Sequence, residues 1–214
     1  MGFIKELEKL YSEVWRQYPG EMTVLDYLQA QAEVLAKAHQ RKSPAVYWQI
    51  SNWHPELVGK KCAQILKTPF SDYDAQWTIA REHGFADWDD AQRRGNTHAD
   101  LDFEYAVEAV INGGAEELHA LLHQNPKLIH ATSSFGHRAT LLHYIAANGV
   151  ETRRQKIPSN AVDIVQTLIA AGARTDALMH VYNGQFDTLS LLTSSAHAVN
   201  SGLTEHITAL LQHP

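Results

Sequence analysis

The chain has 214 residues, of which 44% are hydrophobic and 20% are charged, and its formal net charge is -6 at pH 7. This length and composition are sufficient for a sizeable core and predict a mostly ordered globular protein. The negative charge argues against general nucleic-acid affinity, which needs a clustered basic face, and no stretch approaches the length of a membrane span.

The cysteine content and the first residues bear on the cellular compartment. Cys62 is the only cysteine, so an intrachain disulfide and a cysteine-based metal site are excluded. The initial segment MGFIKELEKLY mixes charged with apolar residues and lacks the apolar core of a signal peptide. We therefore expect a cytoplasmic protein with no membrane partner and no nucleic-acid partner.

Residues 1–95 are predicted to form a helical N-terminal region. Apolar residues recur at steps of three and four from Phe3 to Tyr18, which is typical of a helix that packs on a core. Pro19-Gly20 is expected to end this helix. The short polar segment Gly95–His98 is the best candidate for a domain boundary.

Several further helix starts follow in the same region. Thr23 and Ser71 are each followed three positions later by an aspartate, which is an approximate capping box. Ser43-Pro44 is predicted to begin a short helix, and residues 59–66 another. Four tryptophans are interpreted as core rather than as a cofactor site: Trp48, Trp53, Trp77 and Trp88.

Residues 101–214 contain an internal repeat of helical segments. AEELHALL at 115–122, VDIVQTLI at 162–169 and TEHITALL at 204–211 share one apolar pattern. An earlier helix is predicted before each of them, in the segments FEYAVEAVINGG, ATLLHYIAANG and DTLSLLTSSAH. The pattern predicts three stacked helix pairs, because a single pair does not bury its apolar face alone.

These segments resemble the ankyrin-repeat family. TLLHYIAANG at 140–149 is similar to the T-P-L-H-x-A-A-x-x-G signature, and VDIVQTLIAAGARTDA is similar to the second ankyrin helix with its loop. The resemblance implies that Thr140 and His143 stabilise the start of the helix and that Gly149 permits a tight turn. Over nearly the whole chain, segments such as DAQWTIAREHGFADW also resemble bacterial ankyrin-repeat proteins of uncharacterised function.

The resemblance implies an all-α fold in which a helical N-terminal region, residues 1–95, packs on an ankyrin-like solenoid of about three repeats, residues 101–214. Such a fold implies a protein–protein interaction module that presents a concave face to a protein partner. We expect a monomer or a weak homo-oligomer. No enzymatic activity and no cofactor are expected, since no catalytic constellation is evident.

The loop at residues 150–160 is the strongest candidate for a binding site, because insertions in a solenoid map to one face. Its two arginines suit an anionic peptide or an acidic cluster on a partner, and a solvated loop without a binding role is the alternative. We expect it to lie near the segment that opens the next unit. The predicted partner-binding residues are Arg153, Arg154, Gln155, Lys156, Tyr182, Asp187 and His197.

Two patterns invite other chemistry. His119 and His123 have the spacing that lets two imidazoles share a metal ion, but no third ligand is evident, so no metal site is predicted. Ser194, Ser195 and His197 lie too close along one segment for a catalytic triad and are interpreted as a helix end.

An alternative function is a small-molecule-binding protein or an enzyme. Its pocket is then expected near Arg154, Tyr182, Asp187 and His197, at the seam between two repeat units.

Overall fold

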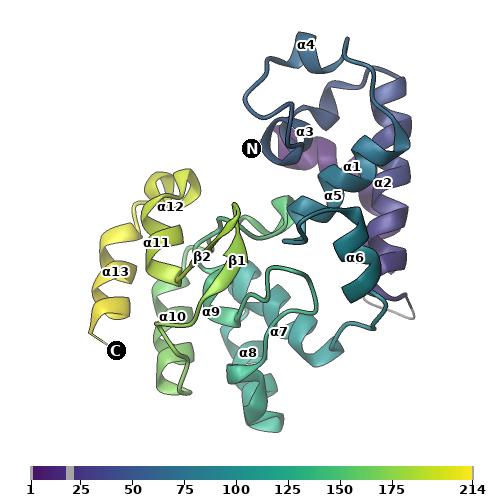
Figure 1. Ribbon diagram of the computed structural model, residues 1–214. Coiled ribbons are helices and arrows are strands. Elements are labelled where there is room, and N and C mark those ends of the chain that lie inside the picture. Colours follow the sequence, from purple (N-terminus) through teal and green to yellow (C-terminus); the bar gives the residue numbers. More distant parts are fainter. Residues whose placement is uncertain (1, 18–21, 214) are drawn as a thin grey trace. The chain divides into compact units, whose positions relative to one another are not determined.

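The structure is a computed structural model that describes residues 2–17 and 22–213 (Figure 1). The chain divides into two compact units, unit 1 over Met1–His98 and unit 2 over Ala99–Pro214. Both units are mainly helical, as the sequence predicts. The side chain of Phe3 is not among those that the structure describes. Tyr18 and the predicted helix end at Pro19-Gly20 lie outside the described residues.

Unit 1 consists of six α-helices and one 3-10 helix in its described part. Their bounds are α1 Gly2–Gln17, α2 Val24–Gln40, η1 Pro44–Val46, α3 Tyr47–Trp53, α4 Cys62–Ile65, α5 Asp72–Glu82 and α6 Trp88–Arg94. Helices α2 and α5 pack against each other at its centre. Leu28, Leu35 and Ile79 from these two helices are fully buried there.

Both predicted capping boxes of unit 1 are confirmed. The hydroxyl of Thr23 accepts from the backbone N–H of Asp26 at 3.1 Å, and the carboxylate of Asp26 accepts from the N–H of Thr23 at 3.2 Å. Ser71 and Asp74 form the same pair of bonds at the start of α5. These side chains satisfy N–H groups that a helix start otherwise leaves without a partner.

Two predictions for unit 1 need correction. The helix predicted over residues 59–66 is reduced to the single turn α4, because Gly59 turns the chain with a φ of +73°. Trp53 and Trp88 are buried in the core as expected, but Trp48 is 41% exposed.

Unit 2 contains helices and one β-hairpin. The helices are α7 Leu101–Asn112, α8 Ala115–Gln124, η2 Pro126–His130, α9 Leu141–Tyr144, η3 Thr152–Arg154, α10 Ala161–Ala170, α11 Thr188–Thr193, α12 Ala196–Ser201 and α13 Thr204–Gln212. The strands are β1 Met179–Val181 and β2 Gly184–Phe186. In the described residues, no helix combines the length and apolar character needed to cross a bilayer.

The helices of unit 2 form two rows. In one row α8 contacts α10 and α10 contacts α13, and in the other row α7 contacts α9 and α9 contacts α11 (Figure 1). Each row therefore takes one helix from each of three successive pairs. The buried side chains that line the pairs include the predicted repeat positions Leu118, Leu168 and Ile207.

Two of the predicted first helices are shorter than their apolar patterns suggest. After α9 the chain continues in tight turns, with Ala147 at a φ of +47°, so the helix spans one turn only. The segment DTLSLLTSSAH is divided into α11 and α12 because the side chain of Ser195 accepts from the N–H of Ala198 and begins a new helix.

The hairpin β1–β2 adds one small two-stranded sheet to the mainly helical fold that the sequence predicts. Its strands are antiparallel, with Met179 opposite Phe186 and Val181 opposite Gly184. The two residues of the turn, Tyr182 and Asn183, have φ values of +52° and +60°. Two consecutive positive φ values define the tight turn that matches the twist of paired strands. The other edge of β1 is anchored where the N–H of His180 donates to the carbonyl of His137 at 2.8 Å.

We predict that Gly149→Ala destabilises unit 2 more than Gly202→Ala. Both glycines have similar positive φ values, +75° and +72°, so each substitution carries a backbone cost of about 1 kcal/mol. A Cβ at Gly149 would also lie 3.0 Å from Cγ1 of Val181, whereas nothing lies within 4 Å at Gly202. Urea unfolding followed by far-ultraviolet circular dichroism measures both costs.

Val181→Ala in the Gly149→Ala background is the control, because it removes the methyl group that the new Cβ meets. The part of the Gly149→Ala cost that exceeds the Gly202→Ala cost, about 1 kcal/mol, should then disappear. Equal costs at Gly149 and Gly202 would contradict the close packing of β1 on this turn.

Candidate functional site

The centre of the predicted binding loop is Arg154, and its guanidinium group is directed into unit 2. Nη2 donates to Oε2 of Glu104 at 2.6 Å, and Nη1 donates to Oε1 of Glu151 at 3.0 Å. Nε donates to Oε1 of Glu108 at 3.1 Å, and Arg153 reaches the same oxygen at 2.9 Å. Each nitrogen of the Arg154 guanidinium therefore has a carboxylate partner.

These charges are almost completely removed from solvent. The side chains of Arg154, Glu104 and Glu151 are 1%, 2% and 4% exposed. Burial opposes the charged form of Arg154, but the carboxylates of Glu104 and Glu151 outweigh it and hold the pKa of the guanidinium well above its ordinary value. The guanidinium of Arg154 is therefore held in its charged form.

The carboxyl groups around Arg154 respond differently to the same surroundings. The pKa of Glu104 is raised because its burial outweighs the attraction of Arg154. Glu108 is less buried, so Arg154 and Arg153 together overcome the effect of burial and lower its pKa. With all groups ionised, the network holds three carboxylates and two guanidinium groups.

Aromatic rings close the network on the side of α9. The Arg154 guanidinium carbon lies 5.7 Å from the ring centroid of Tyr144, which is fully buried. His137 Nδ1 accepts from the N–H of Ala139 at 3.0 Å, so Nδ1 carries no proton, and Nε2 lies 3.6 Å from Oε2 of Glu151. The network, which we call the Arg154 cluster, thereby joins α7, α9 and the loop.

The Arg154 cluster overturns the prediction that Arg154 binds a partner. The sequence shows a basic loop, but it does not show that Glu104 and Glu108, one helical turn apart on α7, lie against that loop. Arg153 is also engaged with Glu108, and its side chain is 17% exposed. Gln155 and Lys156 are half-buried, and Gln155 donates to the carbonyl of Val150 at 2.8 Å, so the loop closes on itself.

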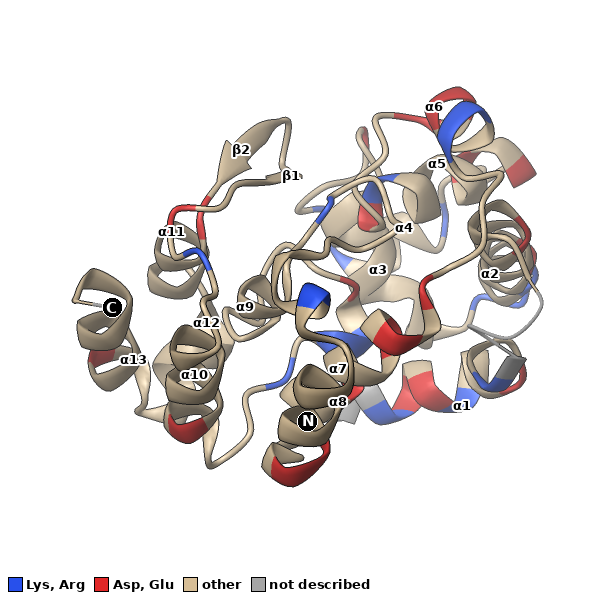
Figure 2. Ribbon diagram, turned by 90° about the horizontal axis from the view of Figure 1, so that it is seen from below, with Lys and Arg blue, Asp and Glu red and all other residues tan. Residues whose placement is uncertain are grey.

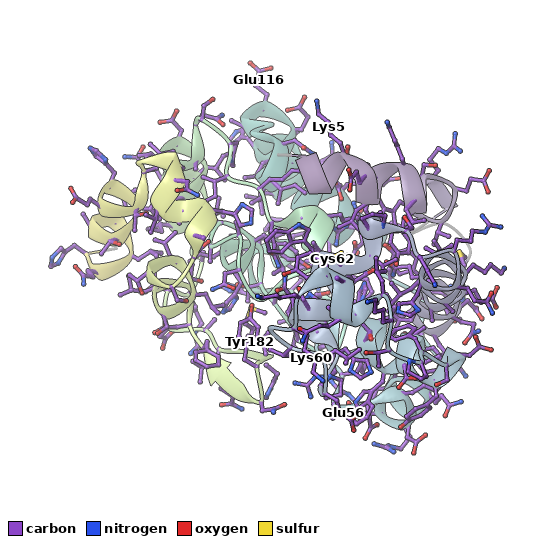
Figure 3. The ribbon with its side chains drawn as sticks, turned by 90° about the horizontal axis from the view of Figure 1, so that it is seen from above. Lys5, Glu56, Lys60, Cys62, Glu116 and Tyr182 are labelled. Carbon is purple, nitrogen blue, oxygen red and sulfur yellow. The ribbon has the colours of Figure 1, made fainter. Side chains whose placement is uncertain are left out.

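The hairpin brings Tyr182 to the surface of unit 2 (Figure 3). Its hydroxyl donates to Oδ1 of Asn148 at 2.8 Å. The Nδ2 group of Asn148 in turn donates to the carbonyl of Leu191 at 3.2 Å and to Oγ of Ser194 at 3.0 Å. Tyr182 as a residue remains 49% exposed, so it is both anchored and accessible. Leu178, just before β1, is 53% exposed.

His143 lies at the start of α9, close to the backbone of the hairpin segment. Its Nδ1 accepts from the N–H of Thr140 at 3.1 Å and lies 2.8 Å from the hydroxyl of the same residue, as expected for the repeat signature. Burial lowers the pKa of His143 to about 4, although the backbone carbonyls of Phe186 and Ala177 act in the opposite direction. The neutral ring is therefore bonded to the start of α9 and lies close to the backbone at both ends of the hairpin segment.

The remaining predicted site residues are not bonded to Arg154 in the part of the chain that the structure describes. Asp187 accepts from the N–H of Ser190 at 2.8 Å and begins α11. His197 lies in α12, where burial lowers the pKa of its half-buried ring. Across the described residues, no hydrogen bond or ion pair joins Arg154 to Asp187 or to His197. The residues that sequence reasoning missed are Glu104, Glu108 and Glu151, whose acidic pattern on α7 and beside η3 was the available signal.

We predict that Arg154→Met lowers the free energy of unfolding by about 3–5 kcal/mol at pH 7, because it leaves buried carboxylates without a counter-charge. Adding Glu104→Gln should recover part of that loss. Arg153→Met is the matched control and should cost about 1 kcal/mol or less, since Arg153 is partly solvated. Urea titrations followed by circular dichroism compare the three variants, and equal costs for Arg154→Met and Arg153→Met would rule out the central role of Arg154.

We also predict a pH dependence that originates at His143. Its folded pKa of about 4 lies below the ordinary 6.5, so its contribution to stability is complete above pH 6.5 and declines as the pH falls toward 4. The loss is on the order of 3 kcal/mol. His143→Gln has no titrating ring, so the stability difference between it and the wild type should narrow over this range. A difference independent of pH would exclude a neutral His143 as the cause.

No group of three or more His, Cys, Asp or Glu side chains in the described part of the chain is placed to hold a metal ion. His119 and His123 are both exposed on α8. Comparisons with protein-family models, with curated proteins and with solved structures find no match to this chain.

Proposed function

We propose that unit 2 is an ankyrin-like array of about three repeats that serves as a non-enzymatic interaction module for a protein partner. The helix pairs α7/α8, α9/α10 and α11/α13 follow one another along the chain, and their first and second helices form separate rows. A hairpin connects the second helix of the middle pair to the first helix of the next pair. These features support a stacked repeat, in which each pair buries the apolar face of its neighbour.

The middle pair carries the most specific support for the ankyrin proposal. Thr140 and His143 bond to each other at the start of α9, which is the role that the T-P-L-H signature implies. Gly149 and Gly172 both adopt positive φ values at the ends of the two segments, where a side chain would strain the backbone. The first and third helix pairs are assigned to the array because their helices lie in the same two rows as those of the middle pair.

The observation that carries the interaction proposal is the exposure of Leu178 and Tyr182 on the hairpin, at 53% and 49%. Contiguous exposed apolar patches mark partner sites, and tyrosine is enriched among residues that dominate binding energy. The bond from Tyr182 to Asn148 restricts the ring before any partner arrives. Less conformational entropy is then lost on binding.

The proposed contact surface therefore shifts from the basic loop to the hairpin. The Arg154 cluster supports this surface indirectly, because it fixes the loop that follows Asn148 and Gly149. Asp187 has a comparable supporting role, since its cap on α11 directly follows β2.

The test compares proteins captured from lysate by the immobilised full chain and its variants. Leu178→Ser/Tyr182→Ser should lose the captured partner by about tenfold or more, as expected for residues that dominate an interface. Val199→Ser is the matched control, since Val199 is a 63% exposed apolar residue on α12, away from the hairpin in sequence. Its capture profile should equal that of the wild type.

Tyr182→Phe separates the ring from its anchoring hydroxyl and should reduce capture less than the double variant. Circular dichroism melting verifies that each variant is folded. An identical set of captured proteins for the wild type, the hairpin variant and Val199→Ser would contradict the proposal.

A further inference from the structure

One segment of unit 1 departs from the charge of the rest of the chain. Residues 41–67 contain five Lys and Arg residues and a single acidic residue, Glu56, which gives the segment a net charge of +4. The rest of the chain has 13 basic and 23 acidic residues and carries -10. The five cations are Arg41, Lys42, Lys60, Lys61 and Lys67.

Folding brings the two ends of this segment together. His39, in the last turn of α2, has its Nε2 atom 2.9 Å from the carbonyl oxygen of Ile65 in α4. The ring of His39 also stacks on Phe70 with centroids 4.5 Å apart. The end of α2, which Arg41 and Lys42 follow directly, therefore lies against α4. The other three cations flank α4 on both sides, and we call the five together the basic end.

The cations of the basic end are available to an external partner. All five side chains are exposed, and none of them forms an ion pair within the part of the chain that the structure describes. Other basic residues of unit 1 are paired with acidic residues or mixed with them along one helix. Arg94, for example, bonds to Asp90 at 2.9 Å, and Lys and Arg alternate with Asp and Glu along α1 (Figure 2).

An apolar side chain lies within the basic end. Val58 is 60% exposed, the highest value among the exposed large apolar residues of unit 1. The positive φ of Gly59 turns the chain directly after it, and Lys60 and Lys61 follow. Trp48 is 41% exposed on α3, which packs against α4. Lysines around an exposed apolar tip are typical of proteins that bind at a membrane–water interface.

We propose that the basic end docks unit 1 on the surface of an anionic lipid bilayer. Four of its five cations are lysines, whose compact charge attracts phosphate groups without the two-pronged geometry that arginine offers to carboxylates. Val58 enters the headgroup region, whereas a valine offers no flat surface on which a nucleic-acid base stacks. These two features favour lipid over an acidic peptide or a nucleic acid.

This docking goes beyond the proposed interaction of unit 2 and does not depend on it. The sequence predicted no membrane partner because the net charge is negative and no segment is long enough to span a bilayer. A peripheral contact needs neither a spanning helix nor a positive net charge. It requires a local cluster of cations within a Debye length of the lipid surface, which the fold of unit 1 supplies.

The test is co-sedimentation of the full chain with vesicles of roughly two parts phosphatidylcholine to one part phosphatidylserine, and with vesicles of phosphatidylcholine alone. The wild type should sediment only with the anionic vesicles, and binding should weaken as salt increases. Lys60→Gln/Lys61→Gln/Lys67→Gln should reduce the partition coefficient about a hundredfold, since each charge accounts for about fivefold.

The matched control is Lys5→Gln/Lys9→Gln/Lys127→Gln, which removes the same charge from exposed lysines outside the basic end. Lys5 and Lys60 project from separate parts of unit 1 (Figure 3). The control should bind within about threefold of the wild type, because none of these three lysines belongs to the basic end. An equal loss in the two triple variants would overturn the proposal, because it would indicate an effect of net charge alone.

Val58→Ser distinguishes lipid from other polyanions. It should weaken vesicle binding by about tenfold, because the valine side chain no longer enters an apolar region. The same proteins are also tested with a single-stranded oligonucleotide and with polyglutamate. Failure of the wild type to bind anionic vesicles at low salt would overturn the proposal. Binding to the oligonucleotide or to polyglutamate that depends on the basic end, without vesicle binding, would also overturn it.

Discussion

The geometry of unit 2 depends on the ion pairs that the buried Arg154 guanidinium forms with three carboxylates. It joins Glu104 and Glu108 of α7 to Glu151 of the loop, and Tyr144 of α9 covers it. A buried ion pair of this kind adds little net stability, but it penalises arrangements in which one charge loses its partners. The cluster therefore specifies where the loop returns to the first helix row.

A second polar link positions the hairpin on this framework. His143 is neutral and buried, and it bonds to Thr140 at the start of α9 while its ring lies close to the backbone of the hairpin segment. Asn148 then connects Tyr182 to the end of α11. The two links hold a two-stranded hairpin that would be marginal in isolation. Its exposed side chains consequently have a fixed position, which is what a recognition surface needs.

Basic residues have opposite roles in the two units. In unit 2, Arg153 and Arg154 neutralise internal carboxylates and leave little charge for a partner. In unit 1, the five cations of the basic end have no acidic neighbour in an ion pair among the described residues. In the sequence, both units show the same feature, which is a short stretch with several basic residues close together. The difference arises from which acidic side chains the fold brings near.

The sequence by itself determined the mainly helical composition, the capping boxes at Thr23 and Ser71, and the Thr140–His143 pair, because each depends on residues within one turn. Only the tertiary structure decided that Arg154 is internal, that the connection after α10 forms a hairpin, and that the end of α2 lies against α4. These features depend on contacts between residues far apart in the chain, such as Arg154 with Glu104 and His39 with Ile65. Local periodicity carries no information about such pairs.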